Sequence, residues 1–351
     1  MTKLNIAVLG AGSWGTALAL VLADNHHDVK LWTHRESQAD QINESHSNEK
    51  YLPGVTLADE ITAFSNIRDA IDSTDMIVFA VPAKATREVA EQVNQVSENP
   101  AVIVHVSKGI EPDTHLRISQ ILEETLTPEA MSDLVVLSGP SHAEEVVKRH
   151  PTTVTAASEN IEAAKKVQDA FMNQHFRVYT NSDVIGVEVG GALKNIIALA
   201  AGITDGLGYG DNAKAALITR GLAEIARLGV KLGAKPLTFS GLTGVGDLIV
   251  TCTSIHSRNW RAGNMLGKGH KLDEVLESMG MVVEGVRTTK AAYQLANKYH
   301  VTMPITSALY QVLFEGVHPK EAVDQLMTRV KTHEMEDLVN ILEDQGEKTG
   351  E

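Results

Sequence analysis

Three glycines near the start of the chain are spaced to bind a dinucleotide. Gly10, Gly12 and Gly15 follow the apolar run Ile6–Leu9 in the pattern G-x-G-x-x-G. In this pattern the first glycine turns the chain out of a strand, the second leaves room for a pyrophosphate, and the third lets a helix pack close to the strand. Backbone N–H groups and the dipole at the start of that helix attract the phosphates. The spacing predicts a dinucleotide site and redox chemistry; the alternative is a glycine-rich turn in another α/β fold.

A lysine within an apolar segment is a second candidate for chemistry. Lys194 interrupts the small and apolar run Val187–Ile197. Because burying an unpaired ammonium is costly, such a lysine tends to lose its proton and to act as a general base. Lys108, in the cluster Ser107–Ile110 directly after a strand-like run, would strengthen this effect if it lay nearby, and Asn195 is able to orient a hydroxyl or a carbonyl. The alternatives are a Lys194 that extends along the helix to solvent and a solvated loop lysine at 108.

Polar residues beyond position 244 form a third cluster. Asp247 stands in Gly-Val-Gly-Asp at an expected helix start, where its alternative role is helix capping. The triplet Ser257-Arg258-Asn259 offers a hydroxyl, a guanidinium and an amide, a compact donor set that suits a phosphate. Cys252 has no base beside it in the sequence, so we interpret it as a small buried residue.

The residues after the second strand-like run bear on which dinucleotide is bound. NAD sites usually carry an acid about 20 residues after the glycine motif, where it bonds the ribose 2′-hydroxyl. Here the run ends Trp32-Thr33-His34-Arg35-Glu36, so the acid follows two basic residues instead of replacing them. Arg35 would pair with a 2′-phosphate, and His34 would lie against the adenine or its ribose. This favours NADP, with NAD also used, and disfavours FAD; the alternative is an Arg35–Glu36 surface pair.

Short apolar runs predict the sheet that would position these groups. They are Ile6–Leu9, Val29–Trp32, Met76–Val81, Ala101–Val106, Leu134–Ser138, Thr152–Ala157 and Phe176–Thr180. Such runs, alternating with helices, are typical of parallel strands covered on both faces. We therefore expect an α/β fold whose N-terminal Rossmann-type domain contains a doubly wound, mostly parallel sheet.

The pattern changes near residue 186, where strand signals give way to helical spacing. Segments 190–201, 212–232 and 286–299 have this spacing and are rich in Ala, Gly and Leu. We therefore expect a dinucleotide-binding domain over residues 1–185 and an all-α substrate-binding and catalytic domain over 186–342. The polar segment 343–351 is expected to be a disordered tail.

Composition excludes several classes of function. The chain has 351 residues, of which 43% are hydrophobic and 22% charged, enough for two domains with their own cores. A formal net charge of −14 argues against nucleic-acid binding and against attraction to anionic membranes. The single cysteine and the lack of a recognisable ligand spacing give no expected metal site, and His26-His27 is expected in a solvated turn. With no secretory or membrane-spanning pattern, we expect a cytoplasmic protein.

Taken together in this order, the motifs resemble the NAD(P)-dependent glycerol-3-phosphate dehydrogenase family of the bacterial biosynthetic type. The resemblance runs over nearly the whole chain, from Lys3 to Lys331. Its segments are Gly10–Gly15, Ser107–Gly109, Ser138–Ser141, Gly190–Asn195, Gly244–Asp247, Ser257–Asn259 and Val283–Gly285. The resemblance implies reversible reduction of dihydroxyacetone phosphate to sn-glycerol 3-phosphate, a step that feeds glycerophospholipid synthesis.

The resemblance also implies roles for individual residues. Lys194 would accept the proton when glycerol phosphate is oxidised and donate it in reduction, with Asn195 and Thr251 in support. The implied substrate-binding residues are Lys108, Gly139, Ser141, Lys194, Asp247, Ser257, Arg258 and Asn259. Together with the residues singled out above, the expected dinucleotide contacts are Gly10, Gly12, Ser13, Trp14, Gly15, His34, Arg35, Lys108, Ala143, Arg258, Val282 and Glu284. A homodimer is the expectation for this family.

Two other functions fit parts of the pattern. A β-hydroxyacid dehydrogenase also joins a nucleotide domain to a helical domain and uses a lysine, but it would need a carboxylate clamp in place of a phosphate site. A non-catalytic dinucleotide sensor would need neither Lys194 in an apolar setting nor the phosphate-binding triplet.

Overall fold

The computed structural model describes residues 2–280 and 282–331, which form two compact units. The first unit holds the chain up to Lys108 together with Leu116–Val184, and the second holds Gly109–His115 together with the chain from Ile185 onward. The segment Gly109–His115 therefore groups with the helical unit, although the sequence analysis placed it in the dinucleotide-binding domain. The expected tail 343–351 and residues 332–342 of the expected helical domain lie outside the described residues.

The side chains of the segment Gly109–His115 explain this grouping. Ile110 is 3% exposed and belongs to the hydrophobic core of the helical unit. The Gln294 amide donates to Asp113 Oδ1 at 3.3 Å, and Gln294 Oε1 lies 3.2 Å from His115 Nε2. Buried apolar surface and side-chain hydrogen bonds thus fix the segment to the second unit rather than to the sheet.

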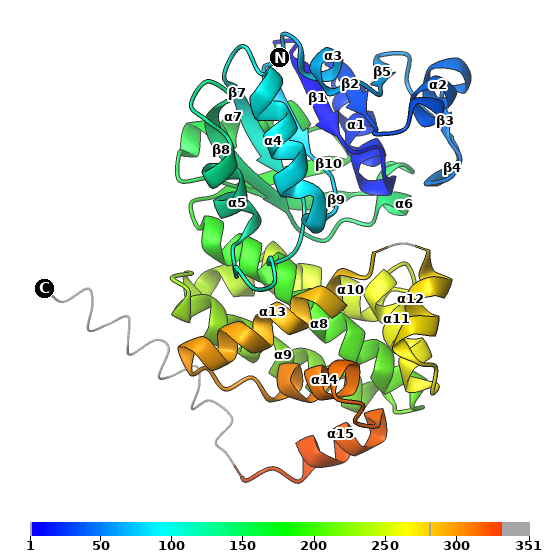
Figure 1. Cartoon of the computed structure of the whole chain (residues 1–351), viewed down its shortest axis with the longest axis vertical. Helices are drawn as coiled ribbons and strands as arrows, with labels where there is room; N and C mark the ends of the chain where they lie inside the picture. Colours follow the sequence, from blue (N-terminus) through cyan, green and yellow to red (C-terminus); the bar gives the residue numbers. More distant parts are fainter. Residues whose placement is uncertain (1, 281, 332–351) are drawn as a thin grey trace, which may run out of the picture. The chain divides into compact units, whose positions relative to one another are not determined.

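The first unit contains an eight-stranded sheet of order β10-β9-β8-β7-β6-β1-β2-β5 (Figure 1). Its strands are β1 (Asn5–Leu9), β2 (Asp28–Trp32), β5 (Ile61–Phe64), β6 (Met76–Phe79), β7 (Ala101–His105), β8 (Met131–Ser138), β9 (Thr152–Ala157) and β10 (Phe176–Asn181). Neighbouring strands are parallel except β8 and β9, which are antiparallel. The sheet is mostly parallel and doubly wound, as predicted.

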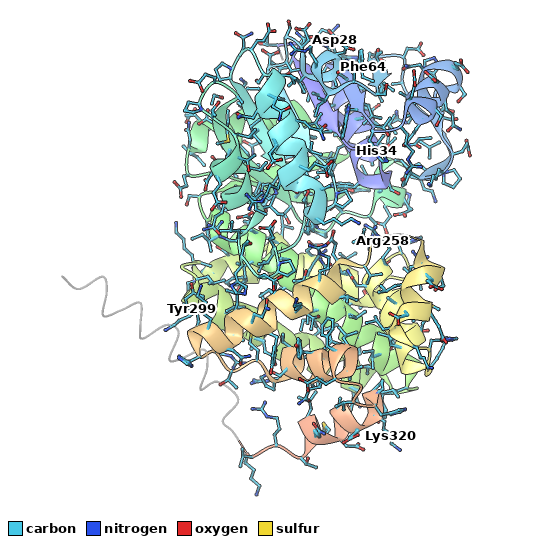
Figure 2. The ribbon with its side chains drawn as sticks, viewed as in Figure 1. Asp28, His34, Phe64, Arg258, Tyr299 and Lys320 are labelled. Carbon is cyan, nitrogen blue, oxygen red and sulfur yellow. The ribbon has the colours of Figure 1, made fainter. Side chains whose placement is uncertain are left out.

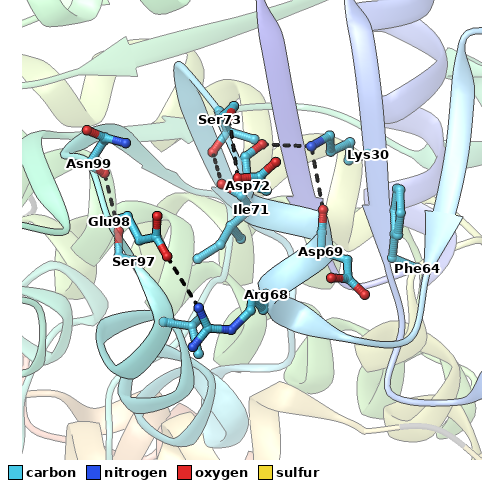
Figure 3. Close-up of a pocket in the computed structure, with 12 residues that line it drawn as sticks. Lys30, Phe64, Arg68, Asp69, Ile71, Asp72, Ser73, Ser97, Glu98 and Asn99 are labelled. Carbon is cyan, nitrogen blue, oxygen red and sulfur yellow. Dashed lines mark hydrogen bonds and ion pairs between the residues drawn. The ribbon is translucent and has the colours of Figure 1, made fainter.

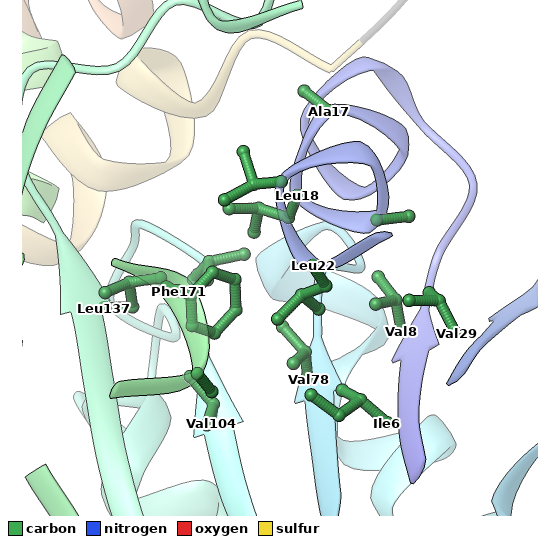
Figure 4. Close-up of a cluster of buried hydrophobic side chains, with 14 of the residues drawn as sticks. Ile6, Val8, Ala17, Leu18, Leu22, Val29, Val78, Val104, Leu137 and Phe171 are labelled. Atoms are coloured by element: carbon green, nitrogen blue, oxygen red, sulfur yellow. The ribbon is translucent and has the colours of Figure 1, made fainter. Parts of the chain in front are cut away.

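Helices cover both faces of this sheet. They are α1 (Ser13–Asp24), α2 (Glu36–Ser45), α3 (Ile67–Ile71), α4 (Thr86–Val96), α5 (Ile118–Thr125), α6 (Ala143–Val146) and α7 (Ile161–Phe171), with a short helix η1 (Ala83–Ala85). Alternate residues of each strand point to opposite faces, so Ile6 and Val8 pack with α1 and α7, whereas Ala7 and Leu9 pack with α4 and α5. Figure 4 shows the first of these layers, with Leu18 and Leu22 of α1 beside Val8 and Val78.

The sequence analysis did not predict β5 or the two-stranded hairpin β3 (Ser47–Asn48) and β4 (Leu52–Thr56). These strands are short and half-exposed, and β5 lies at the edge of the sheet, so they lack the continuous apolar runs that mark buried parallel strands. Another expectation was wrong: His27 is 1% exposed, because Leu4 N donates to its Nδ1 and its Nε2 lies 3.2 Å from the carbonyl of Ala170. Burial lowers the pKa of His27.

From Ile185 onward, the regular elements that the structure describes in the second unit are all helical. Its elements are α8 (Val184–Gly206), α9 (Asp211–Lys231), η2 (Pro236–Ser240), η3 (Leu242–Gly246), α10 (Asp247–Thr253), α11 (Arg258–Gly267), α12 (Leu272–Met279), α13 (Glu284–Tyr299), α14 (Pro304–Phe314) and α15 (Pro319–Met327). Among the residues described, α8 alone is long and apolar enough to span a membrane, but 89% of its most apolar window is buried. Many of its side chains belong to the hydrophobic core of this unit, so α8 packs as a core helix inside the protein.

Candidate functional site

The glycine-rich turn has the geometry that a pyrophosphate needs. Gly10 has a φ of +119°, and a Cβ there would lie 2.7 Å from the carbonyl oxygen of Ala80, so only glycine fits this position. A Cβ on Gly15 would lie 1.9 Å from the carbonyl oxygen of Gly10, so α1 packs directly on the turn. Gly12, the N-cap of α1, has nothing within 4 Å of the place a Cβ would take. The open side of the turn therefore faces the start of a helix, where a phosphate fits.

Basic and aromatic side chains gather where β2 ends. Arg35 Nη2 donates to the Tyr51 hydroxyl at 3.0 Å, and its Nε donates to His34 Nε2 at 3.3 Å. Ser13, the first residue of α1, donates to the backbone carbonyl of Tyr51 at 2.9 Å. The structure thus joins three of the predicted dinucleotide contacts through Tyr51, and within the described residues Glu36 is not a partner of Arg35. His34 itself is exposed (Figure 2).

Tyr51 is a candidate cofactor residue that the sequence analysis missed. It lies between the strands β3 and β4 of the unpredicted hairpin, in a stretch without apolar periodicity. No spacing rule connects it to Arg35, because the two meet only when the hairpin folds back beside the glycine-rich turn.

Lys108 meets two other predicted substrate residues at the carboxyl ends of β7 and β8. Its Nζ donates to the carbonyl oxygen of Gly139 at 3.1 Å, and the Ser141 hydroxyl donates to the same oxygen at 2.9 Å. Gly139 has a φ of +149°, and a Cβ there would lie 2.9 Å from Val154 Cα. The neighbouring strand thus presses against this backbone, which holds the carbonyl that orients the Lys108 ammonium.

The side chain of Lys194 is buried beside a carboxylate in the second unit. Its Nζ forms an ion pair with Asp247 Oδ1, and the two side chains are 7% and 1% exposed. Lys194 also donates to Thr251 Oγ1 at 2.7 Å, while the Thr251 hydroxyl donates to the backbone carbonyl of Asp247 at 2.6 Å. The Thr251 hydroxyl thus donates its proton to the Asp247 carbonyl and accepts the hydrogen bond from Lys194.

This pairing corrects the reasoning by which Lys194 was singled out. We expected an unpaired ammonium that gives up its proton on burial, but a carboxylate in contact favours the charged form. Asp247 is the first residue of α10, and its carboxylate bonds Lys194 instead of serving only as a cap. The chemistry that follows is an ammonium held in a fixed place, which is a proton donor.

Close backbone packing brings these two helices together. A Cβ on Gly190, one turn before Lys194 on α8, would lie 2.5 Å from the carbonyl oxygen of Thr243. Thr243 belongs to η3, a single π-helical turn that leads directly into α10. Such turns are frequent at functional sites. Gly190 thus admits the turn that delivers Asp247 to Lys194.

The triplet Ser257-Arg258-Asn259 stands at the start of α11. Ser257 is the N-cap, and its hydroxyl accepts a hydrogen bond from the backbone N–H of Trp260. Arg258 is exposed (Figure 2), and its Nη1 donates to the carbonyl oxygen of Val282 at 3.3 Å. Arg258 and Val282, both predicted dinucleotide contacts, are therefore neighbours.

Asn259 connects three helices rather than projecting freely. Its Nδ2 donates to Asn195 Oδ1 at 2.9 Å, and its Oδ1 accepts from the backbone N–H of Gly285 at 2.9 Å. Asn195 lies next to Lys194 on α8, and Gly285 follows Glu284, the first residue of α13. Asn259 thus ties the start of α11 to the segments that carry Lys194 and Glu284.

The remaining candidate residues lie in the hydrophobic cores or pack against them. Ala143 is buried at the start of α6 and packs in the core of the first unit, which also receives the half-buried Trp14. Cys252 is fully buried, as predicted, and burial raises the pKa of its thiol to about 12. A thiol in that state is not a nucleophile, so Cys252 has a packing role.

A cavity of about 400 Å³ in the first unit contains none of the predicted residues. It lies near the amino ends of β6 and β7, where Lys30 donates to the carbonyl of Asp72 at 2.7 Å and Arg68 pairs with Glu98 at 3.4 Å (Figure 3). The glycine-rich turn follows the carboxyl end of β1, at the opposite edge of these parallel strands. The cationic groups of the cavity thus already have partners, and ligands of such sheets bind at the other edge.

Comparison with known proteins agrees with this geometry. The family models described as NAD-dependent glycerol-3-phosphate dehydrogenase N-terminus and C-terminus match residues 5–164 and 183–324. A Bacillus pumilus protein named glycerol-3-phosphate dehydrogenase (NAD(P)+) is 70% identical over 97% of this chain and 99% of its own. A Geobacillus kaustophilus protein of the same name is also 70% identical, over 97% and 99%.

Comparison with solved structures points to the same family. The crystal structure of glycerol-3-phosphate dehydrogenase from Coxiella burnetii superposes with a TM-score of 0.89 at 38% identity, covering 93% of this chain and 99% of that one. The resemblance inferred from the motifs and the predicted fold class are both confirmed. The chain therefore belongs to the NAD-dependent glycerol-3-phosphate dehydrogenase family, oxidoreductases that act on a CH–OH group.

Proposed function

We propose that this chain catalyses the reversible, NAD(P)-dependent reduction of dihydroxyacetone phosphate to sn-glycerol 3-phosphate and so supplies glycerophospholipid synthesis. The observation that carries the proposal is the buried pairing of Lys194 with Asp247 and Thr251. Reduction of a ketone needs a proton donor held at the carbonyl oxygen, and a paired, buried ammonium is such a donor.

The chemistry divides between hydride transfer and proton transfer. When bound, NAD(P)H supplies the hydride that is added to C2 of the ketone. Lys194 donates a proton to the carbonyl oxygen, so that C2 gains the hydride, the oxygen gains the proton, and the ketone becomes the secondary alcohol. In the oxidative direction Lys194, once neutral, takes the hydroxyl proton. Arg258 binds the phosphate, and this remote binding energy holds C2 in place for the transfer.

Other residues of the proposal bind and orient the two reactants. The substrate-binding group is Lys108, Gly139, Ser141, Lys194, Asp247, Ser257, Arg258 and Asn259. The dinucleotide group is Gly10, Gly12, Ser13, Trp14, Gly15, His34, Arg35, Lys108, Ala143, Arg258, Val282 and Glu284, to which Tyr51 is added. For Ser257 and Asn259 the proposal combines binding with the structural hydrogen bonds described above.

A preference for NADP over NAD is proposed from the cations after β2. The Tyr51 hydroxyl accepts a hydrogen bond from Arg35 and so holds a guanidinium where a 2′-phosphate would need one. No carboxylate among the described residues bonds Arg35, which supports an anionic ligand there.

The first experiment follows NADPH absorbance with dihydroxyacetone phosphate, with NADH in parallel, for wild type and Lys194→Ala. We expect fast oxidation by wild type, faster with NADPH, and a loss of kcat of about 100- to 10,000-fold in the variant. Lys235→Ala, which removes a lysine from the same unit, serves as the control. A wild type that binds NADPH but does not oxidise it with dihydroxyacetone phosphate, whether or not it reduces NADP⁺ with 3-hydroxy acids, would refute the proposal.

We also propose that the active form is a cytoplasmic homodimer. Family resemblance supports the dimer. Sedimentation equilibrium at micromolar concentration is expected to give twice the chain mass. A monomer at all concentrations that support activity would exclude the dimer as the required form.

A further inference from the structure

The carbonyl oxygen in the middle of the glycine-rich turn is held by two buried amides. Ala11 lies between Gly10 and Gly12, and its carbonyl accepts from Gln38 Nε2 at 2.8 Å and from Asn48 Nδ2 at 3.0 Å. Gln38 is 9% exposed and Asn48 is fully buried. Neither residue belongs to the dinucleotide group proposed above, and both lie at least 20 residues beyond the turn.

The hydrogens of both amides are fully used. Gln38 Nε2 also donates to Asn48 Oδ1 at 3.2 Å, and Asn48 Nδ2 also donates to Thr16 Oγ1 at 2.8 Å. Gln38 Oε1 in turn accepts from the Thr33 hydroxyl at 2.8 Å. A satisfied network of this kind allows one arrangement of its members, because any rotation would leave a buried polar atom unbonded.

This arrangement fixes the direction of a neighbouring N–H group. In a trans peptide the carbonyl and the N–H point in opposite directions. Because two amides hold the Ala11 carbonyl on the protein side, the N–H of Gly12 points away from them. Gly12 is the N-cap of α1, and the space beside its Cα is open. The network therefore orients a donor toward the place where a phosphate would bind.

The same network also includes the residues after β2 that are proposed to bind the adenosine part of the dinucleotide. Thr33, which holds Gln38, directly precedes His34 and Arg35, and its Oγ1 accepts from the backbone N–H of Arg35 at 3.4 Å. The turn and the end of β2 are therefore held by one set of bonds.

We propose that Gln38 and Asn48 are positioning residues for the dinucleotide, which they serve by presetting the Ala11–Gly12 peptide for the pyrophosphate. The choice of NADPH as the ligand rests on the proposed function. The two residues touch no reacting atom, so their effect belongs to cofactor binding and not to proton transfer.

The test measures NADPH affinity by titration without substrate, for Asn48→Leu and Gln38→Glu. Leucine removes both donors of Asn48, and glutamate keeps the shape of Gln38 while placing an oxygen against the Ala11 carbonyl. We expect the Kd for NADPH to rise about tenfold or more in each variant. The KM for NADPH should rise with it, whereas kcat at saturating NADPH and the KM for dihydroxyacetone phosphate should stay within about twofold.

Asn43→Leu is the matched control. Asn43 lies on α2, the helix that carries Gln38. Its side-chain amide donates to the backbone carbonyl of Ala63 at 2.9 Å and accepts from the Ala63 N–H at 2.7 Å, but it does not touch the turn. A lowered Tm with unchanged Kd in Asn48→Leu and Gln38→Glu, as in Asn43→Leu, would overturn the inference. A wild type that binds NADPH without reducing dihydroxyacetone phosphate would instead refute the proposed function, and the Kd comparison would still decide this one.

Discussion

The carboxylate of Asp247 decides the chemical state in which Lys194 is buried. An ammonium and a carboxylate in contact stabilise each other's charged forms, whereas removing one partner leaves an uncompensated buried charge. In the proposed mechanism this charged Lys194 is the proton donor for ketone reduction, and the hydroxyl of Thr251 limits the directions in which its N–H bonds can point. Without Asp247, the lysine would lose its proton more readily, and the proposed mechanism would lose its acid.

A second buried carboxylate, Glu224 on α9, has a structural role. Its oxygens accept from the backbone N–H groups of Ile305 and Thr306, at 2.6 and 3.1 Å, and from the Thr306 hydroxyl at 3.1 Å. It thus caps α14, whose own N-cap residue, Met303, offers no side-chain bond. Burial raises the pKa of Glu224 to about 7, against the opposing effect of these donors.

This pKa makes the stability of the folded chain depend on pH. Because the folded value exceeds the unfolded one, the proton stabilises the fold below about pH 4.5, and that contribution is lost as the pH rises through 7. Between pH 5 and 8 the free energy of unfolding of wild type should fall by about 2 to 3 kcal/mol more than that of Glu224→Gln.

Urea unfolding of both proteins at pH 5 and pH 8 measures this difference. Glu277→Gln, at an exposed glutamate of α12, should keep the pH dependence of wild type. Equal pH dependence in wild type and Glu224→Gln would show that Glu224 does not titrate in this range.

At the scale of elements, paired glycines set the distance between α8 and α11. A Cβ on Gly202 would lie 2.0 Å from the carbonyl of Trp260, and one on Gly263 would lie 2.0 Å from the carbonyl of Leu199. The two backbones are therefore in contact. Trp260 adds a second tie, since its indole donates to Asp205 at 2.7 Å. This crossing places the start of α11, with the triplet Ser257-Arg258-Asn259 that is proposed to bind the phosphate, against the helix that carries Lys194.

Gly263→Ala tests whether this distance matters for the substrate. The added methyl has no room, so we expect a loss of stability of about 1 to 3 kcal/mol and, because α11 must shift, a raised KM for dihydroxyacetone phosphate. Thermal unfolding and steady-state kinetics provide the two values. Gly210→Ala, where nothing lies within 4 Å, should leave that KM unchanged. An unaltered KM in Gly263→Ala would mean that α11 does not need this close crossing to bind substrate.

At the scale of the whole molecule, the net charge is acidic, although the proposed binding sites rely on individual cations. The chain carries a net charge of −14, yet the proposed ligands are anions. In the proposed function, binding depends on a few cations held in place, such as Arg35 by Tyr51 and Lys108 by Gly139, rather than on the overall field. The two units have separate hydrophobic cores, and a short segment of the first half of the sequence, Gly109–His115, contributes Ile110 to the second core.

The sequence by itself determined the glycine-rich turn, the positions of the main strands along the chain and the residue types available for chemistry. These follow from short-range effects, namely backbone sterics at glycine and the two-residue and 3.6-residue periods of side-chain burial. Only the tertiary structure decided which groups meet. Lys194 and Asp247 are 53 residues apart, and Tyr51 reaches Arg35 through a hairpin that no apolar pattern marks. Whether a buried lysine is unpaired or an ion-pair partner depends on such long-range packing, and so the protonation state of Lys194 could not be read from its neighbours in the sequence.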